Sequence, residues 1–474
     1  MPLSHYRFAD TDKYIRMTSD IVPFEKPCKE LNMRYAIIFC VLSVLYFPQA
    51  HAGEGQVLIT GVNVFNSLEA RIEKDVSVVI EGNRIAGVHD RRPEGPFDQI
   101  IDGSGHVLMP GLIDTHVHLA ITAGISESME LPWDYLSHTM AKRSRDMLLR
   151  GFTSVRDLGG PVFGLKRAVD EGLVDGPRIF PSGAFITQTS GHGDFRRPVD
   201  GHPEFGGAAT NAQRLGFFRL ADGVPQVLAS TRENLGKGAT QIKIMGSGGV
   251  GSMFDPVDSI QYTPDELRAI VQAARDWDTY AAAHLHNAPA IRRAVEAGVM
   301  SVDHGFMMDE EGARMMAEKG VFLSTQFAIL EMVFEMEFLT EWQLQKARMV
   351  VDASHDMVGY IKKYGIKTTF SSDSFGPESL SASLQTREFE ARSKFFTPVE
   401  ILQHATANAA ELLELSGRRN PYPGKLGVIE AGAMADLIIV RGNPLEDISL
   451  LGDPAANLLL IMKDGKVFKN TLKK

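Results

Sequence analysis

The stretch Pro110-Gly-Leu-Ile-Asp-Thr-His116-Val-His118 places two histidines one residue apart. It reads as one short β-strand, because β-branched residues alternate along an apolar run that follows a Pro-Gly turn. Side chains two residues apart on a strand point to the same face, so His116 and His118 have Cα atoms about 6.6 Å apart. Two imidazoles at that separation can bind one metal ion such as Zn²⁺. An isolated His-x-His pair is more often a coincidence, so the rest of the chain must supply further ligands.

Composition sets the class of protein. The chain has 474 residues, 44% of them hydrophobic and 23% charged, with a net charge of −10. These values are ordinary for a globular protein with one large and one smaller domain. The acidic balance argues against nucleic-acid binding, because no surplus of Lys and Arg is present to neutralise phosphates.

The first 52 residues contain the pattern of a secretory signal peptide. Met33-Arg34 precedes an apolar run over residues 36–47, and Ala50-His51-Ala52 supplies an A-x-A cleavage site. The run is too short to span a bilayer, which takes about 20 residues. We expect a signal peptide over residues 33–52 and export to the periplasm or the medium, with no membrane attachment after cleavage. Residues 1–32 do not resemble a signal peptide. One explanation is that translation begins at Met33 and that the start site was assigned too far upstream.

Cysteine usage agrees with this cleavage. Cys28 and Cys40 both precede the cut. The mature chain would therefore contain neither a disulfide nor a cysteine nucleophile.

Short strands and turns occupy both ends of the remaining chain. Alternating or apolar runs predict strands over residues 57–60, 76–80 and 84–88, a strand over 436–440 and a hairpin over 457–468. Neither end has enough strands to form a stable sheet alone. We expect both ends to pair into one composite β-sandwich, with the middle of the chain inserted between them.

The middle repeats a different unit, in which a helix end is followed by a glycine, an apolar strand and a polar residue. Thr263-Pro-Asp-Glu266 and Thr397-Pro-Val-Glu400 are capping boxes that mark helix starts. The predicted strands lie within residues 113–118, 151–157, 178–183, 238–243, 280–284, 298–304, 320–326 and 365–373. Eight β/α units favour a (β/α)₈ TIM barrel, whose active site lies at the carboxyl ends of the strands. A doubly wound sheet is the alternative, but no glycine-rich phosphate motif follows a first strand.

The predicted organisation is therefore an extension with a signal peptide over 1–52, the first part of the sandwich over 53–110, the barrel over 111–416 and the second part of the sandwich over 417–474. The predicted strand ends carry residues able to bind metal ions: His116, His118, Lys243, His284, His304 and Asp373. His192 and His286 lie near the same rim, and His138 lies in an early helix.

Lys243 is the most informative of these residues. In Gln241-Ile-Lys-Ile-Met245, alternation turns Lys243 away from its apolar neighbours and into the barrel interior. Burial lowers the pKa of a lysine and favours the neutral amine. A neutral amine can add CO₂ to form a carbamate, an anion able to bridge two metal ions. A salt bridge to Asp157, Asp303 or Asp373 is the alternative.

These motifs together resemble the amidohydrolase superfamily. The segments that carry the resemblance are 110–118, Lys243, 284–286, 302–305, 372–373, 397–410 and 432–437. The chain is most similar to the binuclear branch of Xaa-Pro and Xaa-Arg carboxypeptidases (dipeptidases), which includes ochratoxin-hydrolysing amidohydrolases. The resemblance covers nearly all of residues 55–470 and implies a (β/α)₈ barrel with a composite β-sandwich.

The resemblance implies two Zn²⁺ ions per chain, bridged by carboxylated Lys243 and a hydroxide. It implies that the first ion is also bound by His116, His118 and Asp373. The second ion would also be bound by His284 and His304. His284 and His286 lie on the same strand face, so geometry alone allows either one. The family position matches His284, which leaves His286 as a substrate contact.

The implied reaction is hydrolysis of an amide in a small molecule. Zinc lowers the pKa of bound water to about 7, so a hydroxide can attack the carbonyl carbon. Asp373 would take the proton and deliver it to the leaving nitrogen. His192 would help to polarise the carbonyl, and a purely structural role in its loop is the alternative.

The family branch implies a leaving amino acid with a free carboxylate, as in an N-acyl amino acid, a dipeptide or ochratoxin A, which would give ochratoxin alpha and phenylalanine. Arg196 and Arg197 are candidate partners for that carboxylate, and solvated loop charges are the alternative. Residues 327–336 could line an apolar pocket, although their helical spacing is more often that of a core. The resemblance also implies a homo-oligomer, such as an octamer.

Two other functions remain open. A mononuclear hydrolase of the imidazolonepropionase type, or a deaminase, would share His116, His118, His304 and Asp373. Such enzymes lack a bridging lysine and typically place an acidic residue shortly after the histidine that ends the fifth predicted strand, over residues 280–284. This chain has Asn287 there. A non-catalytic protein that binds a small molecule would be expected to have lost at least one metal-binding residue, and none of the six is missing.

Overall fold

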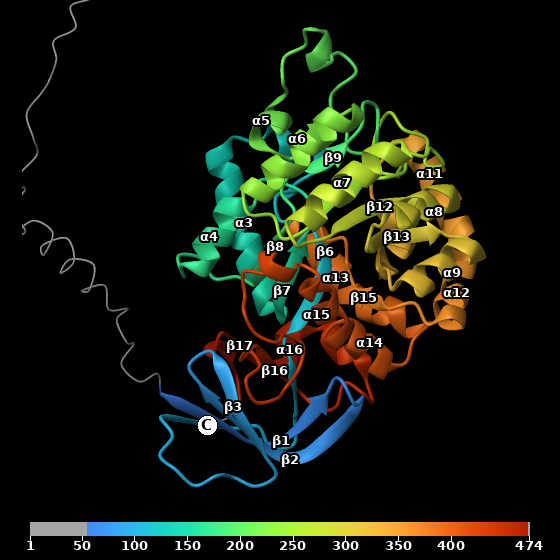
Figure 1. Ribbon diagram of the computed structural model, residues 1–474. Helices are drawn as coiled ribbons and strands as arrows, with labels where there is room; N and C mark the ends of the chain where they lie inside the picture. Colours follow the sequence, from blue (N-terminus) through green and yellow to red (C-terminus); the bar gives the residue numbers. More distant parts are fainter. Residues whose placement is uncertain (1–54, 473–474) are drawn as a thin grey trace, which may run out of the picture. The chain divides into compact units, whose positions relative to one another are not determined.

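The computed structural model describes residues 55–472, and its strands form three sheets (Figure 1). One sheet has eight strands and takes them from both chain ends, in the order β18-β17-β16-β5-β1-β2-β3, with β4 beside β1. Its strands are β1 (Gln56–Asn66), β2 (Arg71–Glu81), β3 (Arg84–His89), β4 (Gln99–Asp102), β5 (Val107–Pro110), β16 (Leu437–Val440), β17 (Leu458–Lys463) and β18 (Lys466–Asn470).

The two chain ends meet where β16 pairs antiparallel with β5. Apolar side chains from both ends share one buried cluster, which includes Val62 and Val78 from the front and Ile439 and Leu460 from the back. The predicted association of the two ends is therefore confirmed. The pairing gives one continuous sheet and does not separate the two layers of a sandwich.

The middle of the chain forms parallel strands in two further sheets. The three-stranded sheet contains β6 (Leu112–Val117), β7 (Phe152–Asp157) and β8 (Arg178–Pro181). The seven-stranded sheet contains, in spatial order, β10 (Phe218–Leu220), β9 (Phe185–Thr187), β11 (Ile242–Met245), β12 (Ala281–Asn287), β13 (Ser301–Met307), β14 (Phe322–Thr325) and β15 (Thr368–Phe370). All eight predicted strands are present, whereas β9 and β10 were not predicted.

Two contacts connect the two parallel sheets, one beside β15 at an end of the seven-stranded sheet and one beside β11, the third strand of that sheet. Val117, at the end of β6, forms an isolated parallel bridge with Ser374, shortly after β15. The amide of Thr240, just before β11, donates to the carbonyl of Pro181 in β8 at 2.8 Å. The protein therefore has an α/β fold with parallel strands, although strand pairing does not assign one closed barrel.

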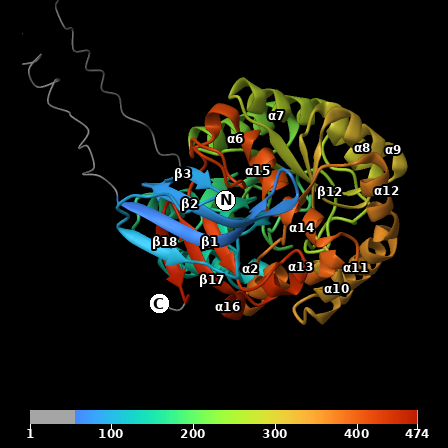
Figure 2. The ribbon, with the colours of Figure 1, turned by 90° about the horizontal axis from the view of Figure 1, so that it is seen from below.

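Helices follow these strands along the chain, and Figure 2 shows α7, α8, α9 and α12 around the outer side of the strands. The helices are α2 (Ile125–Glu130), α3 (Trp133–Leu149), α4 (Phe163–Asp170), α5 (Asn211–Leu215), α6 (Gly223–Gly236), α7 (Pro264–Asp276), α8 (Ala288–Ala297), α9 (Glu310–Lys319), α10 (Ala328–Met332), α11 (Glu341–Ala353), α12 (Met357–Tyr364), α13 (Glu378–Ser393), α14 (Pro398–His404), α15 (Ala407–Glu414) and α16 (Pro454–Asn457). The capping boxes at Thr263 and Thr397 are both formed.

Among residues 55–472, no helix has both the length and the apolar character needed to cross a membrane. The predicted signal peptide lies outside these residues. The predicted domain boundaries stay predictions.

Candidate metal centre

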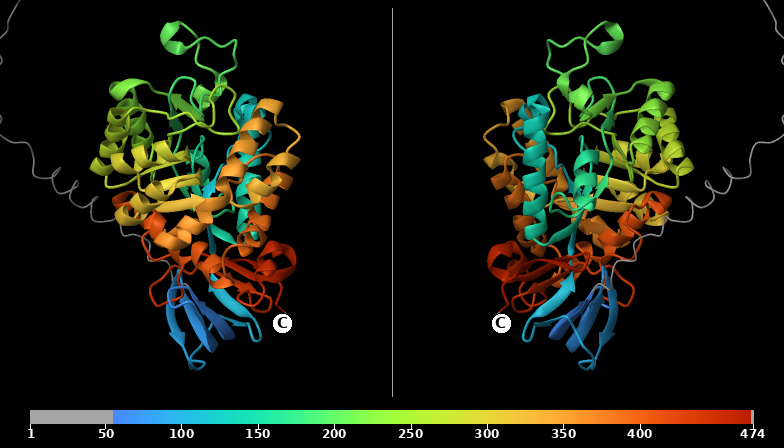
Figure 3. Two further views of the ribbon diagram at one scale, coloured as in Figure 1. Left: turned by 90° about the vertical axis from the view of Figure 1, so that its right-hand side faces the viewer. Right: turned by 90° about the vertical axis from the view of Figure 1, so that its left-hand side faces the viewer.

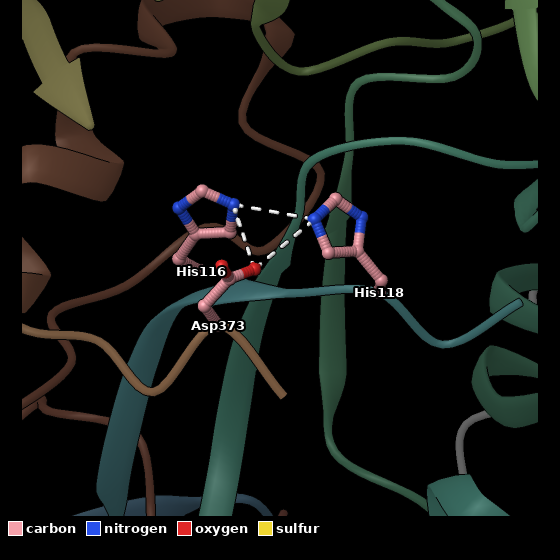
Figure 4. Close-up of side chains that lie close together, drawn as sticks. All are labelled: His116, His118 and Asp373. Atoms are coloured by element: carbon pink, nitrogen blue, oxygen red, sulfur yellow. Dashed lines mark hydrogen bonds and ion pairs between the residues drawn. The ribbon is translucent and has the colours of Figure 1, made fainter. Parts of the chain in front are cut away.

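His116, His118 and Asp373 converge where β6 and β15 end (Figure 4). The Nε2 atoms of the two histidines lie 3.3 Å apart. Oδ1 of Asp373 lies 3.4 Å from Nε2 of His116 and 3.3 Å from Nε2 of His118. The alternation of side chains along β6 thus brings both histidines to one point, as the sequence predicts, and β15 supplies the carboxylate from the other end of the chain.

These three side chains fit a divalent metal ion. Burial, aided by the nearby ammonium of Lys243, lowers the pKa of His116 to about 4, so its ring is neutral at pH 7. Nδ1 of His116 faces Oδ1 of Asp303 at 3.5 Å, which places the ring proton at Nδ1 and the lone pair at Nε2. Burial raises the pKa of Asp373, but the surrounding histidines outweigh it and keep the carboxyl ionised. Neutral imidazole and carboxylate are the forms that bind metal ions.

The remaining predicted ligands lie in the same pocket, which His116, His118, Lys243, His284, His304 and Asp373 all line. The ring centroids of His284 and His304 are 4.5 Å apart, and those of His116 and His304 are 5.0 Å apart. Nδ1 of His304 is 2.9 Å from Oε1 of Gln326, which leaves Nε2 as the free nitrogen. Nε2 of His284 is 3.2 Å from the carbonyl of Gly248, which leaves Nδ1 free. The structure therefore brings all six predicted ligands together.

Lys243 is only 1% exposed and forms an ion pair with a buried aspartate. Its Nζ lies 2.8 Å from Oδ2 of Asp303, and Oδ1 of Asp303 lies 2.8 Å from the guanidinium of Arg156. Burial lowers the pKa of Lys243, and Asp303 opposes that shift. The unmodified lysine therefore adopts the salt bridge that the sequence left as the alternative to carboxylation.

Backbone strain marks two of the candidate ligands. His304 has φ of +70° and Asp373 has φ of +50°. These left-handed conformations are uncommon for residues other than glycine, and strained residues cluster at active sites.

His192 and His286 lie beside the predicted ligands. The ring of His192 stacks on that of His284, with centroids 4.0 Å apart. Nδ1 of His192 is 2.7 Å from Oγ of Ser252. His286 stacks on Phe306, and burial lowers the pKa of His286 to about 3. Both histidines line the pocket, and their role as substrate contacts stays a prediction.

The walls of the pocket are apolar. They include side chains of α10, α11 and the segment between them, where η2 (Val333–Glu335) lies, and residues from other parts of the chain: Ile121, Ile125, Phe185, Phe195, Val250, Ile329, Leu330, Val333, Met336, Phe338, Leu339, Val350 and Phe375. Residues 327–336 therefore contribute both to the core and to the pocket. Sequence reasoning missed Phe185, Phe195 and Val250, because β9 is short and no periodic pattern marks the two loops.

Arg196 and Arg197 do not line the pocket. Arg196 donates two hydrogen bonds to Asp194, at 2.8 and 2.6 Å. Arg197 is exposed and donates to Asp200. The segment that follows them, with η1 (Pro203–Phe205), projects away from the helices (Figure 3). The structure therefore places both guanidinium groups away from the metal centre, each already paired with a carboxylate, and His138 also lies outside the pocket lining.

The chain belongs to the amidohydrolase family, whose model matches residues 107–468. It is 31% identical to an ochratoxinase of Aspergillus niger over 381 residues, which cover 77% of this chain and 76% of that protein. The structure is similar to that of a prolidase complexed with N-methylphosphonate-L-proline, with a TM-score of 0.81, 37% identity and coverage of 88% of this chain and 100% of the other. It is also similar to a Xaa-Pro dipeptidase with bound methionine, with a TM-score of 0.76, 30% identity and coverage of 88% and 100%.

These similarities confirm the family that the motifs around His116, Lys243 and His304 indicate. The protein is a hydrolase that acts on C–N bonds of amides or peptides. Its fold is that of the amidohydrolases.

Proposed function

We propose that the protein is a zinc-dependent hydrolase that releases a C-terminal amino acid from N-acyl amino acids or dipeptides. The observation that carries this proposal is the convergence of six potential metal ligands, from five different strands or strand ends, in one pocket. His116, His118 and Asp373 would hold one Zn²⁺ ion, His284 and His304 a second, and carboxylated Lys243 would bridge them.

The bound metal ions would supply an activated water at neutral pH and polarise the amide carbonyl. Asp373 would be the proton carrier of the site, because its Oδ1 lies 3.4 and 3.3 Å from the two Nε2 atoms that would hold a metal ion, next to the activated water. It would accept a proton from that water and deliver it to the leaving nitrogen. With Nδ1 accepting from the hydroxyl of Ser252 at 2.7 Å, Nε2 of His192 would carry the ring proton and donate to the carbonyl oxygen.

The ion pair of Lys243 bears on carboxylation. A carbamate would carry a negative charge at the position where the ammonium now faces Asp303. Asp303 would keep its partner Arg156, at 2.8 Å, so the carboxylate would not become unpaired. Arg156 is fully buried and cannot lose its proton, which makes it a permanent counter-charge.

The apolar walls favour substrates with apolar or aromatic side chains. Within residues 55–472, Lys243 and Asp373 are the only pocket-lining residues of the Lys, Arg, Asp and Glu types. The free carboxylate of a substrate would therefore meet the N–H group of His286, in place of the predicted Arg196 and Arg197. Ochratoxin A, with its aromatic acyl group and phenylalanine, fits this description and is the first substrate to test.

Three further proposals accompany this function. We infer that the two parallel sheets are parts of one (β/α)₈ barrel, which the bridge at Val117–Ser374 and the hydrogen bond from Thr240 to Pro181 support. We infer that the shared sheet of the chain ends folds as a composite sandwich. Export through a signal peptide over residues 33–52 and assembly into a homo-oligomer rest on the sequence and on the family resemblance.

The test is metal analysis combined with a substrate panel. Purified mature protein, Lys243→Ala and the control Lys237→Ala, which alters an exposed lysine, are compared on N-acyl amino acids, dipeptides and ochratoxin A. We expect about two zinc ions per chain in the wild type and the control, and loss of amide cleavage in Lys243→Ala. One metal ion per chain, with full activity in Lys243→Ala, would overturn the binuclear proposal.

A further inference from the structure

The loop that follows β11 is held by a buried lysine of α11. Nζ of Lys346 donates to three carbonyl groups of this loop, those of Gly249 at 2.7 Å, Ser252 at 2.7 Å and Asp255 at 3.2 Å. The side chain is only 1% exposed. An ammonium group that leaves water loses much solvation energy, so it is retained only where several acceptors replace the water. The loop therefore folds around Lys346.

The same loop aims a buried carboxylate at His192. Oδ2 of Asp255 accepts from the amide of Gly249 at 2.8 Å and lies 3.7 Å from Nδ1 of His192. Its Oδ1 is buried without a hydrogen-bond partner among the residues that the structure describes. Oγ of Ser252 is 2.7 Å from the same Nδ1. Nδ1 of His192 is thus fixed by the loop, and Nε2 is left for a ligand in the pocket.

The charges within this group support each other. Burial raises the pKa of Asp255, but His192 and Lys346 outweigh that effect and hold the pKa at about 2. Burial lowers the pKa of Lys346, and Asp255 opposes that shift. Asp255 is therefore a carboxylate that lies between two groups able to carry positive charge.

Packing also fixes the ring of His192. One face stacks on His284 at a centroid distance of 4.0 Å. On the loop side, a Cβ atom added at Gly249 would lie 2.3 Å from Cε1 of His192, closer than real contacts allow. Only glycine lets the loop come this close to the ring.

We propose that Asp255 and Lys346 are positioning residues that set the orientation of His192 over the metal centre. The effect on catalysis rests on the proposed function, in which His192 contacts the reacting amide. Lys346 lies one residue before Ala347 and one helical turn before Val350, which both line the pocket. A single helix, α11, thereby fixes an apolar wall of the pocket and, through the loop, the histidine opposite the amide.

The first experiment is a double-mutant cycle. The variants are Asp255→Asn, His192→Gln and the double variant, with Asp258→Asn, an exposed residue of the same loop, as the control. In Asp255→Asn we expect kcat to fall about 10- to 100-fold, as for other residues that orient ligands of a site, with KM, zinc content and melting temperature little changed. In the His192→Gln background, Asp255→Asn should lower kcat little further, because the two residues act as one unit. An equal loss in both backgrounds would overturn the proposal.

The second experiment does not depend on activity. Crystal structures of Asp255→Asn and Lys346→Met are compared with that of the wild type. We expect the ring of His192 to leave the 4.0 Å stack on His284 in each variant that folds. If Lys346→Met does not fold, Asp255→Asn decides alone, and a ring that stays in place refutes the inference. If the wild type cleaves no amide in the panel, the proposed function fails, while the crystal structures still decide the orientation of His192.

Discussion

Replacement of Asp303 by asparagine should destabilise the protein to a degree that depends on the state of Lys243. Asp303 is fully buried between two cations, with Oδ1 2.8 Å from Arg156 and Oδ2 2.8 Å from Nζ of Lys243. Asparagine keeps the shape and removes the charge. In the metal-free, unmodified protein the change leaves two buried cations without a carboxylate, which costs about 3–5 kcal/mol.

The size of this penalty should fall when Lys243 is carboxylated. The carbamate is an anion, so Asp303 then has one cationic partner and one negatively charged neighbour. Removal of its charge costs an interaction with Arg156 but relieves repulsion from the carbamate. We expect the penalty to fall by more than half, to about 1–2 kcal/mol, since at short range the two terms are of similar size and opposite sign.

The assay is guanidinium chloride unfolding, followed by far-ultraviolet circular dichroism, under two conditions. One sample contains a chelator and no bicarbonate, and the other contains zinc and bicarbonate. Asp265→Asn is the control, because it removes a surface ion pair with Arg268, and such pairs contribute about 0–1 kcal/mol. An Asp303→Asn penalty below about 1 kcal/mol in the metal-free sample, or the same penalty in both samples, would refute the reasoning.

Three further predictions follow from single positions. His116→Asn should lower the zinc content by about one ion per chain or more, measured by mass spectrometry of metals, because it removes an Nε2 atom from the His116–His118–Asp373 group. Gly111→Ala should lower the free energy of unfolding by about 1–3 kcal/mol, because the new Cβ would lie 2.1 Å from Oγ1 of Thr153. His404 is buried beside the Arg392 guanidinium, and both burial and that cation hold its pKa well below 6.5. The unfolded chain therefore binds the extra proton below pH 6.5, so stability is lost as pH falls. His404→Asn should reduce the loss of stability between pH 7 and pH 5 by about 2 kcal/mol in urea unfolding of the metal-free protein.

The strands that carry the ligands could be predicted because their side chains obey two simple rules. Alternation along a strand places His116 and His118 on one face and turns Lys243 away from Ile242 and Ile244. Capping boxes and left-handed glycines mark where the helices begin and end; Gly298, for example, ends α8 with φ of +99°. These signals depend only on neighbouring residues in the sequence, so they can be recognised without knowledge of the fold.

The walls of the pocket could not be predicted in the same way. A helix that lines a pocket and a helix that packs in a core have the same apolar spacing. The spacing within residues 327–336 therefore did not distinguish a pocket wall from a core helix. Lys346 and Asp255 are 91 residues apart in the chain, and no pattern links them. For Arg196 and Arg197 a signal was present, since Asp194 and Asp200 lie close enough in sequence to pair with them, as they do.

Two buried carboxylates flank the metal centre, and each is held beside a buried cation. Asp303 faces Nδ1 of His116 and pairs with Arg156, whereas Asp255 faces Nδ1 of His192 and lies beside Lys346. Both carboxylates act on the nitrogen that points away from the pocket, so each fixes which nitrogen points in. The charges thus lie behind the imidazoles, and the pocket surface beyond the metal centre, His192 and His286 is apolar. Substitutions of side chains on the far walls should alter substrate preference and leave the metal centre intact. The exception is α11, where Lys346 joins the wall to the loop that holds His192.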